Sequence, residues 1–217
     1  MHNRGIHNEE LSANFFDPIH GIRRKPTNNI SDVPSLASEY YQWNFGLLIE
    51  HILIRYHRFS KVAIARICDR LIDVLDTPRQ GIANEHLHRF PVLTTSREWL
   101  HCMEYMEQEV FAYITALAEV DQTLGELPTL IAVSLSDAIT IINETRNRFK
   151  AAATVSQCLI KETIDHSSID FSLLEVDDLL SRVLKELEVQ SFLEESVLFP
   201  RALRLERETT ERAATIL

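Results

Sequence analysis

The sequence predicts an all-α fold, an antiparallel up-down four-helix bundle preceded by a mostly irregular N-terminal arm. Hydrophobic residues make up 45% of the 217 residues, but the chain has only 5 Gly and 7 Pro, too few for a fold with many tight turns. The apolar residues recur three and four positions apart over long stretches, which is the periodicity of helices that pack along one face. Only short connections separate these stretches, as in an antiparallel bundle.

The expected elements follow from breaks in this periodicity. Residues 1–34 mix Asn, Gly, Pro and charged residues, and we expect an irregular arm there. A four-helix domain is expected over 35–208, followed by a C-terminal tail at 209–217. Its first helix should run from residue 35 to about 75, with a kink near Ser60.

The starts of the next three helices are predicted from capping signals and proline. Thr94, Thr95 and Ser96 offer N-caps for a second helix that ends near residue 120. Pro128 fits the first turn of a third helix, which ends near residue 161. The segment from His166 to Asp170 offers caps for a fourth helix, which ends near residue 208.

The fourth helix carries the clearest apolar seam. Two polar residues interrupt it, and an unpaired buried carboxylate would cost several kcal/mol, on the order of a broken buried ion pair. Glu194 must therefore be paired, protonated, near an open end or bound to a cation. The seam comprises Leu173, Val176, Leu180, Val183, Leu187, Gln190, Glu194 and Val197.

Charge and composition exclude several functional classes. The net charge is -10, and the stretch from Glu162 to Glu195 holds ten acidic residues and two basic ones, so a nucleic-acid partner is not expected. This acidic stretch is either a solvated helix face or a docking patch for a basic partner. No apolar run is long enough for a membrane span, and the opening segment lacks a signal-peptide core, so a cytoplasmic protein is expected. The three cysteines lack CxxC spacing and should be free thiols.

Two motifs stand out at the ends of the predicted bundle: LIEHILIRYH spans Leu48 to His57, and LEESVLFPRAL spans Leu193 to Leu203. Together they resemble the hemerythrin-like di-iron proteins of the RIC family, which repair iron centres under nitrosative stress. Between them, EQEVFAYI, beginning at Glu107, is similar to an internal acidic segment of that family. The resemblance implies a hemerythrin-like bundle in which histidines and carboxylates from the helices meet at one metal centre.

The resemblance also implies that most of the metal ligands have been replaced. His57 matches the first-helix histidine, and the H-x-x-x-E pair of the second helix falls on Cys102 and Met106. The third-helix histidine falls near Ala138. In the fourth helix the pair becomes Gln190 and Glu194, so only its carboxylate is kept. One histidine and one carboxylate are too few donors to hold two irons.

The vestigial metal site is therefore His57, Glu194, Gln190 and Cys102, and each has a structural alternative. His57 is either a remnant ligand or a core histidine that donates to Glu194. Cys102 is either a soft ligand or redox thiol, or a small buried hydrophobe. Elsewhere, His51 is expected to be structural, and surface metal binding by a group of loop and helix histidines is the alternative to an incidental cluster: His86, His88 and His101.

The function implied is a metal-poor binding or regulatory module related to the iron-sulfur cluster repair and nitric oxide stress proteins. The alternatives are a residual mononuclear iron-binding or nitric oxide-sensing protein, and an oligomerising interaction protein. No cofactor is expected at full occupancy, and iron at a residual site belongs to the first alternative. The expected partners are another protein or further copies of this chain in a homo-oligomer, and no membrane partner is expected. No phosphate loop or nucleophile motif supports covalent catalysis, so the enzyme question stays open.

Overall fold

The computed structural model describes residues 39–76, 90–123, 128, 133–166 and 171–216. Within these ranges every regular element is helical. The predicted arm at 1–34, the loop histidines His86 and His88, and most of the predicted cap before the fourth helix lie outside the described residues. No helix of the described part has both the length and the apolar character needed to cross a membrane.

The first helical segment consists of α2 (Phe45–Ile52), η2 (Leu53–His57) and α3 (Arg58–Asp76). The side chain of Asn44 caps α2 by accepting a hydrogen bond from the Leu47 amide at 2.8 Å. A kink is predicted near Ser60. The structure instead has a π-helical turn, η2, which ends at His57. Such a turn inserts one residue into the helical hydrogen-bond pattern.

The second segment consists of α4 (Pro91–Tyr105), η4 (Met106–Val110) and α5 (Phe111–Thr123). The predicted caps at Thr94 to Ser96 are wrong, because the helix already begins at Pro91. Proline suits this position since its fixed φ is helical and its missing N–H would have no helical partner. A second π-helical turn, η4, again interrupts the middle of the segment.

The third segment is the single long helix α6 (Leu135–His166). Pro128 is not in its first turn, which corrects the predicted start. The hydroxyl of Ser134 instead caps the helix by accepting from the Asp137 amide at 3.1 Å and donating to its carboxylate at 2.7 Å. The capping exchange explains why the helix begins after Ser134.

The fourth segment consists of α7 (Phe171–Phe192), η5 (Leu193–Leu198) and α8 (Phe199–Ile216). It continues past the predicted end near residue 208, so most of the expected tail at 209–217 is helical. The predicted seam is confirmed, because all of its members are buried: Leu173, Val176, Leu180, Val183, Leu187, Gln190, Glu194 and Val197.

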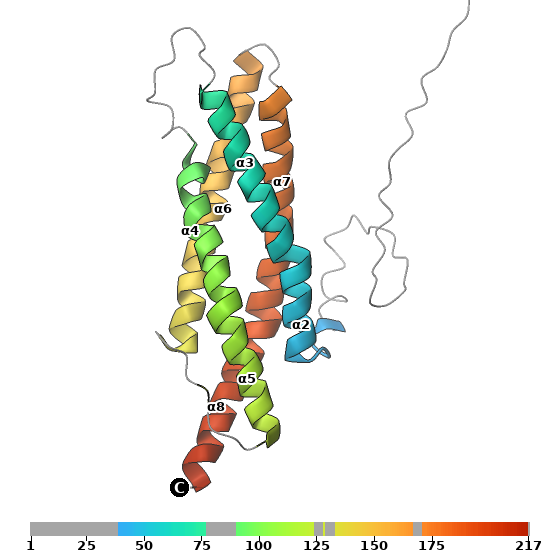
Figure 1. Cartoon of the computed structure of the whole chain (residues 1–217), viewed down its shortest axis with the longest axis vertical. Helices are drawn as coiled ribbons and strands as arrows, with labels where there is room; N and C mark the ends of the chain where they lie inside the picture. The colour runs from blue at the N-terminus through green and yellow to red at the C-terminus, as the bar shows by residue number, and fades with distance from the viewer. Residues whose placement is uncertain (1–38, 77–89, 124–127, 129–132, 167–170, 217) are drawn as a thin grey trace, which may run out of the picture.

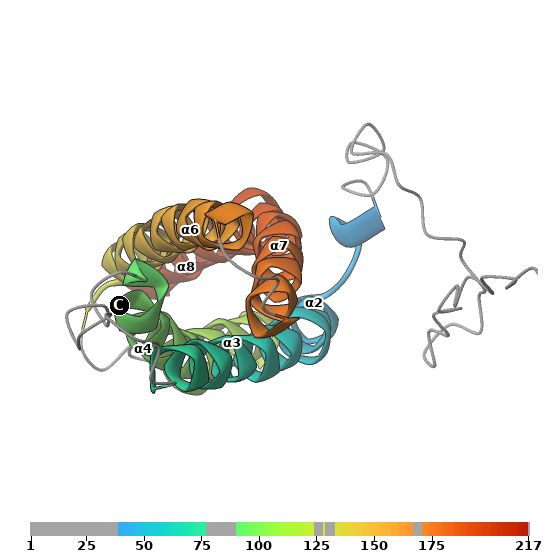
Figure 2. The same cartoon turned by 90° about the horizontal axis from the view of Figure 1, so that it is seen from above.

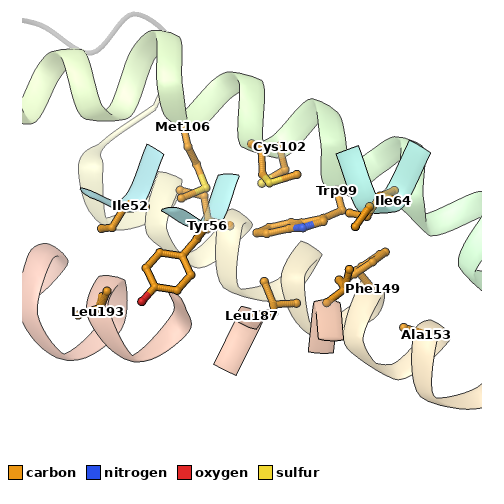
Figure 3. Close-up of a cluster of buried hydrophobic side chains, with 14 of the residues drawn as sticks. Ile52, Tyr56, Ile64, Trp99, Cys102, Met106, Phe149, Ala153, Leu187 and Leu193 are labelled. Atoms are coloured by element: carbon orange, nitrogen blue, oxygen red, sulfur yellow. The ribbon is translucent and has the colours of Figure 1, made fainter. Parts of the chain in front are cut away.

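The helical segments lie side by side around a common apolar interior (Figures 1 and 2). α3 packs on α7, α4 on α6, α6 on α7, and α5 on α8. In the interior, Trp99 of α4 and Phe149 of α6 stack with ring centroids 6.3 Å apart (Figure 3). These contacts are consistent with a helical bundle.

Ion pairs join α7 to the first segment. Glu186 accepts from Arg55 at 2.8 Å, and Glu175 pairs with both Arg66 and Arg70. Several acids of the stretch from Glu162 to Glu195 therefore face bases of this chain. These carboxylates already pair with bases of the same chain, which disfavours the interpretation of this stretch as a docking patch for a basic partner.

Candidate functional site

In the described part of the chain, three π-helical turns bring ionisable residues together at one place between the helices. η2 ends on His57, η4 contains Glu107, and η5 contains Glu194. A π-helical turn is less stable than the α-helix around it, and such turns occur frequently at functional sites. Their convergence on three interacting side chains marks this centre as the candidate site.

His57 lies between the other two residues. Its side chain is 1% exposed, and Nδ1 lies 2.8 Å from Oε1 of Glu107. Its Nε2 faces Oε1 of Glu194 at 3.6 Å, an ion-pair distance that is too long for a direct hydrogen bond. The predicted proximity of His57 and Glu194 is confirmed. On the outer side, Lys61 donates to Oε2 of Glu107 at 2.7 Å.

Glu194 is fully buried, and its carboxylate has three partners. Gln190, one helical turn earlier, donates to Oε1 at 2.8 Å. The guanidinium of Arg146, from α6, donates to Oε2. His57 is the third partner. The carboxylate predicted to need a partner thus has an arginine on one oxygen, with an amide and an imidazole near the other.

Arg146 is itself buried, with a side chain 1% exposed. Its Nη1 donates to Oε1 of Glu195 at 2.5 Å and to Oδ1 of Asn143 at 3.1 Å. The guanidinium carbon lies 5.6 Å from the ring centroid of Trp99, within the range of a cation–π contact. The arginine therefore joins α6 to two successive acids of η5.

These contacts form one network of alternating charge, which we call the charge network. Its members, in order of contact, are Lys61, Glu107, His57, Glu194, Arg146 and Glu195. With His57 protonated, each positive group is followed by a negative one and the formal charges cancel. Alternation compensates for the cost of burying ions, because no charge is left without an opposite neighbour.

The pKa shifts in the network favour the charged forms. Burial lowers the pKa of His57, but its contacts with Glu107 and Glu194 outweigh burial and raise it above 6.5. Burial raises the pKa of Glu194, whereas Arg146 and His57 lower it below 4.5 overall. The pKa of Glu107 is likewise lowered, since His57 and Lys61 outweigh its partial burial.

Cys102 lies beside the network but is not a member of it. The side chain is buried, and it projects from α4 into the interior together with Met106 (Figure 3). Burial raises the pKa of its thiol to about 11, even though nearby Arg146 lowers it. A thiol with so high a pKa is protonated near neutrality, which makes it a poor nucleophile and metal ligand. The geometry favours a small buried hydrophobe.

The sequence prediction missed Arg146 and Glu107. Arg146 follows Thr145 in the third helical segment, and both side chains are buried. A signal was present, because Ile142, Arg146 and Phe149 are spaced four and three apart. Glu107 is one position beyond Met106, where the family resemblance placed a ligand, and it reaches His57 from the η4 turn.

His51 and His101 lie outside the charge network. His51 contacts an aromatic group, with ring centroids 5.3 Å from Trp43 and 5.6 Å from both Tyr40 and Tyr56. This placement agrees with the predicted structural role. His101 is exposed and lies 3.8 Å from Glu104 on the same helix.

The donor set does not fit a di-iron centre. In the part of the chain that the structure describes, no group of three or more His, Cys, Asp or Glu side chains is arranged to hold a metal ion. The imidazole is committed to Glu107 on one side, and a guanidinium is bonded to Glu194 on the other. Two adjacent irons would need several more imidazole or carboxylate donors. Ala138, Met106 and Gln190, at positions matched to family ligands, are buried but supply no such donor.

Comparisons with protein-family models, curated proteins and solved structures find no match to this chain. The site is therefore interpreted from its own geometry and chemistry.

The stability of the protein should depend on pH through His57. Because its folded pKa is raised above 6.5, its stabilising contribution is complete below pH 6.5 and is lost as the pH rises through the folded pKa. Urea unfolding over about pH 6 to 9 should therefore show stability falling on the alkaline side. The variant His57→Gln should lose this alkaline dependence, and an unchanged slope in that variant would contradict the assignment.

Proposed function

We propose that this protein is a hemerythrin-like domain, an antiparallel up-down four-helix bundle related to the iron-centre repair family, that acts as a metal-poor binding or regulatory module. The motifs around His57 and Glu194 support the relationship, and their side chains meet in the interior. The observation that carries the proposal is the ion pair of Glu194 with Arg146. It supplies the carboxylate with a cation from the chain itself.

A binding or regulatory role is favoured over catalysis by how the ionisable groups are used. Each ion of the charge network faces an opposite charge, so the folded state stabilises its charged form and holds its proton or carboxylate in an ion pair, not free for acid–base catalysis. Cys102, the buried thiol nearby, has a raised pKa and is a poor nucleophile. A network of this kind stabilises one arrangement of helices, against which a protein partner or a second copy of the chain would bind.

A second candidate function is residual mononuclear iron binding or nitric oxide sensing. Two buried atoms of ligand type, Nε2 of His57 and Oε1 of Gln190, have no hydrogen-bond partner. Both belong to residues that contact the Glu194 carboxylate. Imidazole nitrogen, amide oxygen and carboxylate together could hold one iron, provided that Arg146 leaves Glu194.

Metal analysis separates the two functions. Protein purified from iron-supplemented cells should contain far less than one iron per chain if the module is metal-poor, and Glu194→Gln should contain the same trace amount. The mononuclear alternative requires about one iron per chain in the wild type, lost in Glu194→Gln because a ligand is removed. About two irons per chain with an oxo-bridged absorption spectrum would overturn the proposal.

A further inference from the structure

The burial of Arg146 calls for an explanation beyond packing. It is one of the largest fully buried side chains in the described part of the chain. Removing a guanidinium from water is costly, and the cost is recovered only when opposite charges and hydrogen-bond acceptors surround it. Arginine is otherwise among the residues least often fully buried. A protein that needed only apolar contacts here would be more stable with leucine or methionine.

The environment of Arg146 is that of a bound cation. Carboxylate oxygens of Glu194 and Glu195 and the amide oxygen of Asn143 accept from its two terminal nitrogens. The ring of Trp99 covers it at 5.6 Å. These are anionic, polar and aromatic groups that stabilise a planar cation in a site shielded from water.

The placement of this cation follows the architecture of the centre. The other three helical segments each have a π-helical turn that carries a member of the charge network. α6, which supplies Arg146, is described as one continuous α-helix. Three segments thus contribute His57, Glu107 and the two acids of η5, and the fourth contributes the positive charge bound to those acids.

We propose that the guanidinium of Arg146 is a built-in substitute for a bound cation, and that the centre is a cation site filled by the chain itself. The inference rests on the proposed metal-poor centre. It adds that the metal position lacks donor residues and is also occupied by the guanidinium of Arg146. Removing the side chain beyond Cβ should therefore leave a cavity beside two carboxylates that have lost their guanidinium partner, and this cavity should bind a free guanidinium ion.

The test compares Arg146→Ala with Arg148→Ala, which removes an exposed arginine from the same helix. Arg146→Ala should melt about 10 °C below the wild type, since the fully buried carboxylate of Glu194 loses its guanidinium partner. Low millimolar guanidinium chloride should raise its melting temperature relative to equal sodium chloride, because a ligand that binds only the folded state stabilises it. The wild type and Arg148→Ala should show no such rise.

A double variant keeps the inference testable if Arg146→Ala does not fold. Arg146→Met with Glu194→Met removes both charges and fills the volume with apolar atoms, so it should melt near the wild type without a response to guanidinium. The inference fails if the double variant is as unstable as Arg146→Ala, because Arg146 would then act through packing. It also fails if folded Arg146→Ala gains no more from guanidinium than Arg148→Ala does. Either failure would leave the iron content of the wild type, and hence the proposed function, unaffected.

Discussion

Glu194→Ala is expected to lower the free energy of unfolding by about 3 to 5 kcal/mol, the cost of leaving a buried ion without its partner. Glu194 is fully buried, and its loss would leave the buried guanidinium of Arg146 with the exposed Glu195 as its remaining carboxylate partner. On the other side it would remove the second carboxylate facing His57. His57→Ala should cost less, roughly 1 to 3 kcal/mol, because Glu107 keeps Lys61 and Glu194 keeps Arg146.

Urea unfolding of the purified variants measures both differences. Glu188→Ala is the matched control, because it removes an exposed glutamate from α7, in the same helical segment. That control should unfold within about 0.5 kcal/mol of the wild type, as surface substitutions usually do. If Glu194→Ala unfolded with the control, the carboxylate would have to be solvated, and the charge network described above would be wrong.

The second large effect expected is a gain of iron binding when the family ligands are restored. The four substitutions are Cys102→His, Met106→Glu, Ala138→His and Gln190→His, all at positions buried in the structure. The variant with these four substitutions should bind little iron while Arg146 is still paired with Glu194. Adding Arg146→Met should raise binding to about one iron per chain or more, because affinity depends on the number and geometry of free donors.

Iron per chain after reconstitution, together with the absorption spectrum, tests this expectation. The matched pair differs only at Arg146, so a difference between its members isolates the effect of the guanidinium. Equal iron binding by the two variants would show that Arg146 does not block the position. If the variant with all five substitutions folded but bound no iron, the alignment of the middle helices with the family's ligand positions would be wrong.

The extent to which this fold could be predicted depends on the signal each helix carries. The fourth helix has an unbroken three-four spacing of apolar residues, and every seam residue lies in the interior. Helix starts were less predictable, because several residues near each start are able to cap. Thr94 lies inside α4, because that helix begins at Pro91. α6 begins only after Ser134, which caps it.

The candidate site was predictable only in part. His57 and Glu194 were expected to meet because both lie on motifs that match the family, and Gln190 lies within reach of Glu194. The π-helical turns were not predicted, since the sequence pattern used assumes a constant helical period. A buried arginine was also missed, because a charged residue beside an apolar seam is normally placed on the surface. The carboxylates, the amide and the aromatic ring that surround its guanidinium explain why Arg146 is buried.

The most direct test of the central claim is a crystal structure of the wild-type protein from iron-supplemented cells, with anomalous diffraction data collected at the iron edge. The account predicts a guanidinium in hydrogen-bond contact with Glu194 and Glu195, and no anomalous peak between His57 and Glu194. A strong iron peak bonded to Glu194, with Arg146 turned away from it, would contradict the account.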